Sequence, residues 1–505
     1  MPGDTPTESL IVFSDVHLGS DIHDGAAPRA RRSEKVDRDL ARLIAHYREH
    51  RSPSADRWRI VIAGDFIDFI GMTVALRPSE LVETSLTEEE EAHGLGSACD
   101  HARVKLRRVA LRHANIFAAL ATFVADGHAL TLIHGNHDIE FHWDAVKDDF
   151  RDILFEHASA LAPDLEREAF SDRIEFNPWF FYRDGVAYIE HGHQYDPFCA
   201  TDHIMAPLSP ADPRRVARAF CDTLLRFVVR PSGMAEHGHE HVGLAYYIRL
   251  GTKLGISGGV DLGVRFARAV GELFRLRREY LSETATILRA EHEERVAKLA
   301  EATRIGADRL RALLSLQSPP LGKSIRGILA GVLLDRLALA LVATFLCIGL
   351  AIFGAFHGHA LWGLGVVLVV WSLLNRWLSR QRNVDPAETL VERATHLARL
   401  FPAAFVVMGH THVPFKAPAG DATYVNVGAW AEEEEEHSGA GGRERSDGEN
   451  EPLAYRAPRT HLVIHTGVAA GSGNGNTSGT AAQLCTWKDT GPEPHGGAEP
   501  FLAKG

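Results

Sequence analysis

The chain has few cysteines, no basic excess and none of the common nucleotide-binding motifs. Its five cysteines include no C-x-x-C pair, which argues against a disulfide framework and favours a reducing compartment. A formal net charge of −12 excludes a general nucleic-acid binder, which needs a basic face. We find no P-loop, dinucleotide fingerprint or internal repeat. A basic N-terminal stretch followed by an apolar run is also missing, so we expect no cleavable signal.

What the chain has instead is a series of short polar segments, each placed directly after an apolar run. The segments are Asp15-Val16-His17, Gly64-Asp65-Phe66-Ile67-Asp68, Gly135-Asn136-His137-Asp138, His191-Gly192-His193 and Gly409-His410-Thr411-His412. The apolar runs are residues 10–13, 60–63, 130–133, 186–189 and 405–408. Such short, β-branched runs predict central strands that are covered on both faces. We expect Gly64, Gly135 and Gly409 to let the backbone turn sharply beside the polar groups.

The side chains in these segments are those of a metal site. Asp, Asn and His offer oxygen and nitrogen ligands without a thiolate, a set that suits Mn, Fe, Zn or a mixed pair. One Asp-x-His alone is more often a turn or a satisfied polar contact. Five such segments, each after a predicted strand, argue against a purely structural role. Two metals that share a carboxylate would form a device for attacking phosphate esters.

With these five motifs the chain resembles the calcineurin-like metallophosphoesterase superfamily, over about residues 8–200 and 398–430. The resemblance implies an α/β, four-layer metallophosphoesterase fold, in which two packed β-sheets are flanked by helices. It implies one metal at Asp15, His17 and His412, and a second at Asn136, His191 and His410, with Asp65 bridging them. Two divalent ions are expected, with Mn favoured over Fe or Zn.

Three further residues are predicted to support catalysis. His137 is expected to donate to the phosphate or the leaving oxygen, with Asp138 orienting its ring; a purely structural His137 is the alternative. Asp68 is expected to orient a ligand, and His193 either to support a ligand or to contact the substrate. The resemblance includes the segment Asn426-Val427-Gly428-Ala429-Trp430, which we interpret as structural or site-lining.

A second region, between the fourth and fifth motifs, predicts a membrane anchor. Residues 337–356 carry no charge, and a helix of this length spans about 30 Å, the thickness of a bilayer core. Residues 360–374 form a second apolar run. Basic residues stand at both outer ends and none in the short turn, so we expect a hairpin with both ends in the cytoplasm. Buried helices of a soluble domain, or a dimerising apolar hairpin, are the alternatives.

The remaining segments complete the expected domain organisation. The predicted parts are 8–205 (first part of the catalytic domain), 206–322 (helical insertion), 323–382 (membrane hairpin), 383–430 (second part of the catalytic domain), 431–459 (acidic, Gly-rich and disordered), 460–490 (terminal strands with a Gly/Ser linker) and 491–505 (loose tail). A basic amphipathic helix around residues 262–280 would lie on the bilayer or pack on its neighbours. Residues 236–241 and the acidic run Glu88 to Glu91 are interpreted as polar, solvated segments.

The expected substrate is a phosphate ester or pyrophosphate. The resemblance to one branch of the superfamily suggests that it is lipid-linked. The segment from Glu190 to Asp196 looks closest to the UDP-2,3-diacylglucosamine hydrolase-like branch, whose members cleave a nucleotide-linked lipid at the membrane surface. The chain departs from that branch in its length, its apolar hairpin and in His137, where those enzymes commonly have Arg. A soluble phosphomonoester, a cyclic nucleotide or a phosphoprotein is the enzymatic alternative, and a non-catalytic membrane scaffold is the other.

Overall fold

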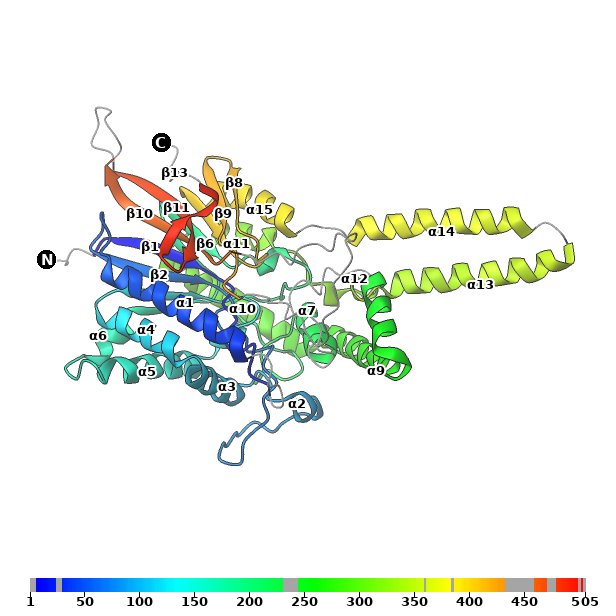
Figure 1. Cartoon of the computed structure of the whole chain (residues 1–505), viewed down its shortest axis with the longest axis horizontal. Helices are drawn as coiled ribbons and strands as arrows, with labels where there is room; N and C mark the ends of the chain where they lie inside the picture. Colours follow the sequence, from blue (N-terminus) through cyan, green and yellow to red (C-terminus); the bar gives the residue numbers. More distant parts are fainter. Residues whose placement is uncertain are drawn as a thin grey trace, which may run out of the picture.

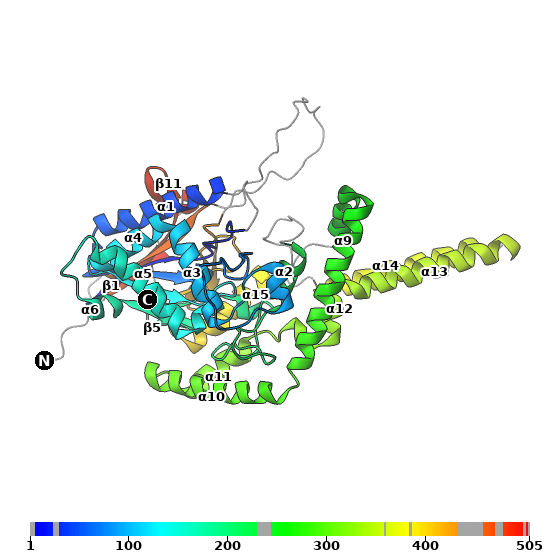
Figure 2. The same ribbon diagram turned by 90° about the horizontal axis from the view of Figure 1, so that it is seen from below.

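The computed structural model describes residues 6–23, 30–229, 244–357, 360–382, 386–431, 458–469, 478–497 and 501–502. Over these residues the chain has a mixed α/β architecture with two β-sheets and many helices (Figure 1). A pair of long helices projects from this body (Figures 1 and 2). The acidic segment 432–457 and the cluster 236–241 lie outside the described residues.

The larger sheet is built around four parallel strands from the first third of the chain. Its strands follow the order β12-β11-β10-β1-β2-β3-β4, with β13 paired to β11. The bounds are β1 Glu8–Phe13, β2 Arg57–Ala63, β3 Ala129–Ile133, β4 Ile174–Asn177, β10 Thr460–Ala469, β11 Ser478–Lys488, β12 Gly491–Pro494 and β13 Phe501–Leu502. β1 pairs in parallel with β2, β2 with β3 and β3 with β4, whereas β10 is antiparallel to β1.

The smaller sheet has five strands in the order β5-β6-β7-β9-β8. The bounds are β5 Phe180–Arg183, β6 Ala187–Glu190, β7 Phe405–Met408, β8 Phe415–Ala419 and β9 Ala422–Asn426. β6, β7 and β9 are parallel, although β6 and β7 are separated by more than two hundred residues of sequence. All five predicted strands are therefore present and central in their sheets.

Alternation along each strand explains why its apolar run is continuous. In β1, Leu10 and Val12 face a core that also contains Ile189 and Val407 of the other sheet. Ile11 and Phe13 face a second core, which is shared with helices. Because successive side chains point to opposite faces, a strand covered on both sides needs an apolar residue at every position.

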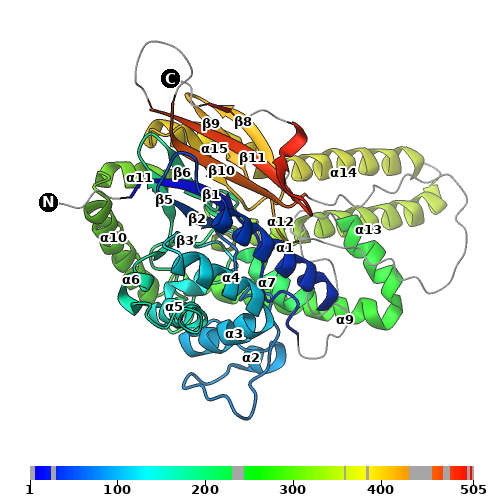
Figure 3. The same cartoon turned by 60° about the vertical axis from the view of Figure 1, so that its left-hand side comes forward.

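Helices cover the outer face of each sheet. α1, α4 and α5 pack on the larger sheet (Figure 3), and α11 and α15 on the smaller one. The bounds of the helices outside residues 206–382 are α1 Ala30–Glu49, α2 Glu88–His93, α3 Cys99–Arg112, α4 Ala114–Ala125, η1 Ile139–His142, α5 Asp144–Ser159, α6 Arg167–Ser171, η2 His193–Tyr195 and α15 Pro386–Leu400.

The segment between β6 and β7 is helical, as predicted for residues 206–322. Its elements are α7 Phe220–Leu224, the π-helical turn η3 Leu225–Val229, α9 Leu244–Glu279, α10 Glu283–Thr303, α11 Ala307–Leu316, η5 Leu321–Lys323, α12 Ile325–Gly331, α13 Leu334–His357 and α14 Ala360–Arg382. On α9, Leu262, Ala269 and Leu273 are buried against α7 and α12. This apolar side of α9 is thus covered by protein.

α13 and α14 form an antiparallel pair whose side chains face outward. Leu334–Phe353 and Trp362–Arg380 are long and apolar enough to cross a membrane, and neither is buried inside the structure. Phe345 is 70% exposed and Trp362 is 84% exposed. Large apolar side chains left in water forgo about 1.5–3 kcal/mol each, and exposed patches of this kind mark a membrane or a protein contact.

The end of the chain is more ordered than predicted. The expected tail 491–505 includes β12, which pairs with β11 through Trp487 and Pro492, and the short β13. The prediction of a loose tail is wrong for these strands. Asp489 and Thr490 fold the chain back so that β12 pairs with the otherwise open edge of β11.

Candidate metal centre

All five polar segments follow the carboxyl ends of their strands and meet at one edge of the two sheets. The backbone N–H of Asp15 donates to the carbonyl of Gly64 over 3.2 Å, and that of Gly409 to the carbonyl of His191 over 3.1 Å. The N–H of His410 donates to Oδ2 of Asp15 over 3.0 Å and joins the two sheets. Neighbouring strands thus gather segments from residues 15 to 412, as expected at the carboxyl edge of parallel strands.

The backbone at this edge is strained. Among the described residues, seven non-glycine residues have a positive φ, and five of them belong to the predicted ligand set: Asp15 (54°), His17 (51°), Asp65 (53°), His410 (70°) and His412 (61°). Asp, Asn and His tolerate this region better than most residues, but it still costs free energy. Such a concentration is typical of a site whose geometry is imposed for function.

Two of the three motif glycines are needed because a side chain there would collide with a predicted ligand, and not because the backbone turns. A Cβ on Gly135 would lie 2.0 Å from Oδ1 of Asp65, and one on Gly409 would lie 2.5 Å from Oδ2 of Asp15. Only Gly64 has a positive φ (87°), and a Cβ there would lie 2.5 Å from the ring of His191. The expectation of sharp turns holds for Gly64, whereas Gly135 and Gly409 allow close approach to a predicted ligand.

The first predicted metal position is assembled in the structure. One ligand atom from each of Asp15, His17 and His412 lies within 4.8 Å of the others. Nε2 of His412 is 3.1 Å from Oδ1 of Asp15, and Nε2 of His17 is 3.8 Å from Oδ2 of Asp65. Three residues predicted for one ion therefore converge, with the bridging carboxylate of Asp65 beside them.

Asp15 shows that these residues suit a cation. Its Oδ1 is buried and accepts no hydrogen bond from the described residues. Its Oδ2 accepts the Oγ–H of Ser14 over 2.5 Å, and the same Oγ lies 3.1 Å from the carbonyl of Gly428. A buried carboxylate oxygen without a donor requires an explanation, and a divalent ion supplies one. Ser14 was not predicted, because a serine after an apolar run carries no signal by itself.

The second position brings together His191, Asn136 and Asp65. Nε2 of His191 lies 3.2 Å from Oδ1 of Asn136 and 3.2 Å from Oδ2 of Asp65. Nδ1 of His191 is 2.9 Å from the carbonyl of Ala63. A carbonyl only accepts, so Nδ1 carries a proton, and Nε2 is the nitrogen that faces the site and could bind a metal.

His410 does not use the same nitrogen. Its Nε2 lies 3.2 Å from Oδ2 of Asp196, and its ligand atoms group with Asp196 and Cys199 rather than with Asp65. Its ring is nevertheless next to that of His191, with centroids 5.3 Å apart. Asp196 is a residue that the sequence did not single out.

Electrostatics at the centre favour bound cations. Burial alone would raise the pKa of Asp65, but His191 and His137 hold it well below its usual range. Burial would lower the pKa of His191, yet the carboxylates of Asp65 and Asp15 raise it to about 9. The buried carboxylates thus create a strong negative potential, which divalent ions would neutralise.

His137 lies at the mouth of this cluster, and Asp68 holds it. Its Nδ1 is 2.7 Å from Oδ1 of Asp68, and its ring stands edge-on to His17 with centroids 4.6 Å apart. Burial would lower its pKa, but Asp68 and Asp65 raise it to about 10. The side chain is 18% exposed. Since Asp68 occupies Nδ1, Nε2 is the atom available to a substrate.

The predicted role of Asp138 needs correction, and Asp68 has a partner that was not predicted for it. Asp138 was expected to orient the ring of His137, but its two oxygens accept the backbone N–H groups of Gly135 (2.6 Å) and Phe66 (2.8 Å). Asp138 therefore fixes the two loops that carry ligands. Asp68, expected to orient a ligand, holds the ring of His137 through Nδ1. One of its ligand atoms also lies within 4.8 Å of one on His17, a predicted metal ligand.

Other predicted residues lie around the centre without joining it. Nδ2 of Asn426 donates to the carbonyl of Gly409 over 2.6 Å, and Nε1 of Trp430 donates to the carbonyl of Thr460 over 2.8 Å. Both roles are structural, as interpreted from the sequence. His193 is only 3% exposed, which favours support of the neighbouring His191 over contact with a substrate.

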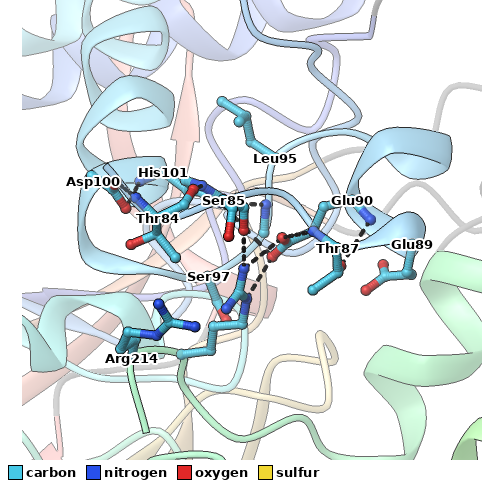
Figure 4. A network of polar contacts seen from close by, with 12 residues as sticks. Thr84, Ser85, Thr87, Glu89, Glu90, Leu95, Ser97, Asp100, His101 and Arg214 are labelled. Atoms are coloured by element: carbon cyan, nitrogen blue, oxygen red, sulfur yellow. Dashed lines mark hydrogen bonds and ion pairs between the residues drawn. The ribbon is translucent and has the colours of Figure 1, made fainter. Parts of the chain in front are cut away.

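A second buried polar cluster lies where the insertion meets α2, and we call it the arginine network. Figure 4 shows the surroundings of Glu90, with Thr87 and Glu89 beside it. The members of the network are Glu89, Glu90, Arg215, Arg218 and Arg226. Arg215 forms a bidentate pair with Glu90 over 2.9 and 2.7 Å. Burial would raise the pKa of Glu89, but Arg218 and Arg226 lower it to about 2. The prediction that Glu88 to Glu91 are solvated is wrong for Glu89 and Glu90, whose partners come from the insertion.

The network also includes the start of α2. Thr87 and Glu90 form a reciprocal capping box, in which Oγ1 of Thr87 accepts the N–H of Glu90. Glu90 therefore caps α2 and binds Arg215 at once, so α2 and the insertion share one carboxylate.

Comparison of the chain with protein-family models, with curated proteins and with solved structures finds no match.

Proposed function

We propose that the chain is a membrane-anchored, dinuclear-metal phosphoesterase with the calcineurin-like metallophosphoesterase fold. The observation that carries the proposal is the convergence of Asp15, His17, Asp65, His191 and His412 at one strained edge of two sheets. The two sheets with helices on their outer faces are consistent with the four-layer fold of that superfamily.

The ligands divide between two ions that share Asp65. Asp15, His17 and His412 would hold one divalent ion, and Asn136, His191 and His410 the other. When both are bound, two such ions would lower the pKa of a water molecule and neutralise the charge on phosphate oxygens. Oxygen and imidazole ligands without thiolate favour Mn, Fe or Zn, and Mn suits the carboxylate and amide oxygens best.

The chain's own residues supply the rest of the chemistry. His137, protonated and aligned by Asp68, donates from Nε2 to a phosphate oxygen or to the leaving oxygen. Asp138 keeps the loops of Asp65 and Asn136 at a fixed separation. These residues distinguish the proposal from a scaffold that only binds metal, because a scaffold has no need of an oriented proton donor.

The hairpin α13–α14 supports a location at the membrane. Its exposed apolar surface requires lipid, and Arg336 and Arg376 stand at its open end. Nε of Arg336 donates to Oδ1 of Asn375 over 2.9 Å and joins the two helices there. By the positive-inside rule both ends lie in the cytoplasm, together with the metal centre. A centre held at the bilayer surface favours a lipid-linked phosphate ester or pyrophosphate as the substrate.

Hydrolysis of bis-p-nitrophenyl phosphate with Mn²⁺ tests the enzymatic part. We expect Asp65→Asn to lower kcat/KM by at least about a hundredfold, since even residues that only support metal ligands cost 10–100-fold. Asp149→Asn is the matched control, because Asp149 pairs with Arg103 on the outer helices. Equal rates in wild type and Asp65→Asn would leave the scaffold as the better description.

Extraction of membranes with carbonate tests the anchor. The wild-type chain should stay in the pellet, whereas Phe345→Glu combined with Ile352→Glu should release it, because each charge in the bilayer costs about 2.5–3.5 kcal/mol. Leu161→Glu, at a position 73% exposed on the catalytic part, should stay in the pellet. Wild-type protein in the supernatant would remove the membrane claim.

A substrate panel separates the alternatives for the leaving group. UDP-sugars, lipid pyrophosphates, cyclic nucleotides and phosphopeptides are compared in the presence of Mn²⁺. We expect the lipid pyrophosphates to have the highest kcat/KM. A preference for a cyclic nucleotide or a phosphopeptide would favour the soluble-substrate alternative.

A further inference from the structure

We infer that Asp196 is a positioning residue, which turns Nδ1 of His410 toward the second metal position, and that the segment leading into the membrane hairpin holds Asp196 in place. The inference rests on the proposed two-metal function and adds a structural link between the bilayer and one of the two ions. It concerns metal affinity, so it can be measured without a substrate.

The first step is the choice of nitrogen on His410. A carboxylate only accepts hydrogen bonds, so the 3.2 Å contact between Asp196 Oδ2 and His410 Nε2 places the proton on Nε2. Nδ1 is then the nitrogen with a lone pair for a metal. His191 has the opposite arrangement, because its Nδ1 donates to the carbonyl of Ala63. The two histidines of the second position therefore each need their own acceptor.

The second step is the rigidity of Asp196. Its side chain is 4% exposed, and its Oδ1 accepts the N–H of Phe198 over 2.9 Å. Its carbonyl accepts the N–H groups of Cys199 (3.0 Å) and Ala200 (2.8 Å). With one carboxylate oxygen held by its own loop, the other is fixed in the direction of His410. This is how a buried carboxylate sets the ring orientation and the tautomer of a metal-binding histidine.

The third step is the attachment of this loop to the segment that enters the hairpin. We call residues 317–324, between α11 and α12, the entry strap. The N–H of Ser318 donates to the carbonyl of Gln194 over 2.8 Å, and its Oγ–H to the carbonyl of Tyr195 over 2.7 Å. The N–H of Leu321 donates to the carbonyl of Pro197 over 3.0 Å. The three bonds thus reach Gln194 and Tyr195, which precede Asp196, and Pro197, which follows it.

The contact continues beyond the entry strap into α12. Lys323 forms an ion pair with Asp202. Gly331, at the end of α12, lies so close to Phe220 that a Cβ would be 2.4 Å from its ring. Phe220 in turn stacks edge-on against Phe198, with centroids 5.6 Å apart. The loop of Asp196 is therefore held from two sides by the elements that precede α13.

The other side of the hairpin returns to the same metal position. α15 follows α14 in the sequence, and Leu390 on α15 would lie 3.4 Å from a Cβ on Gly192, next to His191. By contrast, the first position takes Asp15 and His17 from the larger sheet, where their N–H groups donate to the carbonyls of Gly64 and Asp65. The second ion is thus the one that a change in the hairpin would affect.

Titration of the metal-free, full-length protein with Mn²⁺ in lipid nanodiscs tests the role of Asp196. Wild type should bind two equivalents by calorimetry and by metal analysis. In Asp196→Ala the Kd of one equivalent should rise 10–100-fold, with the other unchanged. Asp196→Asn keeps an oxygen that accepts from Nε2–H, so its affinity should lie between the two. Asp149→Asn is the control for loss of a partly buried carboxylate, and should bind like wild type.

Ser318→Ala tests the entry strap by removing one of the three bonds. The Kd of the same equivalent should rise severalfold and that of the other should not change. Ser315→Ala is the matched control, because Oγ of Ser315 donates to Ala312 within its own helix. Ser318→Ala that binds both equivalents like wild type would overturn the link to the hairpin.

The outcomes separate this inference from the proposed function. Two tight equivalents in Asp196→Ala, or equal losses in Asp196→Asn and Asp196→Ala, would overturn the positioning role while leaving the two-metal enzyme intact. Wild-type protein that binds fewer than two equivalents would overturn the proposed function itself. Thermal unfolding of each metal-free variant shows whether a loss of binding is only a loss of folding.

Discussion

The candidate metal centre and the arginine network are both buried, charged clusters, but their carboxylates have different partners. In the arginine network every carboxylate has a guanidinium partner, and Arg215 meets Glu90 with two hydrogen bonds. In the metal centre the carboxylates of Asp15 and Asp65 stand beside imidazoles, and Oδ1 of Asp15 accepts no hydrogen bond from the described residues.

The difference shows how a structural cluster can be told from a functional one. A buried charge is tolerated when its partners neutralise it and satisfy its hydrogen bonds. The arginine network meets that condition internally, so we expect its loss to reduce stability. In the candidate metal centre, Oδ1 of Asp15 accepts no hydrogen bond from the described residues and the backbone is strained. On the proposed function we therefore expect its loss to reduce metal binding and activity. The four predictions below separate these expectations.

The largest effect should follow removal of one partner from the arginine network. Arg215→Ala leaves Glu90 buried without its bidentate partner, and such losses cost about 3–5 kcal/mol. Denaturant unfolding should show this decrease, with Mn²⁺ affinity unchanged. Arg214→Ala is the control, since Arg214 pairs with Asp212 at the surface with 65% of its side chain exposed. A stable Arg215→Ala variant with weak metal binding would reverse the comparison.

Glu8 should make stability depend on pH in the acid range. Burial would raise its pKa, but Arg59, Arg57 and Arg183 lower it from 4.5 to about 2. A lowered folded-state pKa gives stability above pH 4.5 that is lost as the pH falls from about 4.5 to about 2. The shift corresponds to about 3 kcal/mol. Because Arg183 belongs to β5, Glu8 also joins the two sheets.

Unfolding curves between pH 7 and pH 2 measure this contribution. Glu8→Gln should be less stable at neutral pH and should lose less stability on acidification than wild type. Glu175→Gln, which removes a 44% exposed partner of Arg59, should follow the wild-type curve. Identical slopes for Glu8→Gln and wild type would show that Glu8 is not an acid-sensitive group.

Metal ions should stabilise the fold through the centre alone. At a Mn²⁺ concentration of 100 times Kd, each occupied site adds about 2.7 kcal/mol to the free energy of unfolding. The metal-dependent rise in Tm should be present in Arg215→Ala and reduced in Asp65→Asn. Removal of metal with a chelator should return wild type to its metal-free Tm. A Tm that does not respond to Mn²⁺ would count against the centre.

The smallest effect should come from Ser14, which supports Asp15 through one hydrogen bond. Ser14→Ala should raise the Kd for the first Mn²⁺ about tenfold, at the lower end of the range for residues that orient ligands. Ser52→Ala is the control, because Oγ of Ser52 binds Ser9 at the opposite end of β1. An unchanged Kd would mean that the backbone bonds of Asp15 to Gly64, Trp430 and Ala431 hold it without help from Ser14.

Local sequence signals predicted the strands and the side chains that follow them. Each strand lies between two cores, so its signal is a continuous apolar run that needs no knowledge of its neighbours. The same reasoning located Asp15, Asp65 and His191, since a ligand at a strand end is placed by its own strand.

Contacts between distant segments were not predictable in this way. Asp196 acquires its role from His410, which is 214 residues later, and Glu90 from Arg215, which is 125 residues later. Asp138 was predicted to orient the ring of His137, its neighbour in sequence. In the structure the ring contacts Asp68 instead. Charge alone could not show that Glu90 is buried.

The pairing of β1 with β10 also has a consequence for biosynthesis. The larger sheet begins with residues near the start of the chain and is completed by β10, β11 and β12, which leave the ribosome after α13 and α14. His410 and His412 likewise follow both helices. The larger sheet and the proposed metal centre therefore cannot be completed before α13 and α14 have been synthesised. A nascent chain arrested before residue 405 should hold the larger sheet open and lack both histidines of the fifth segment.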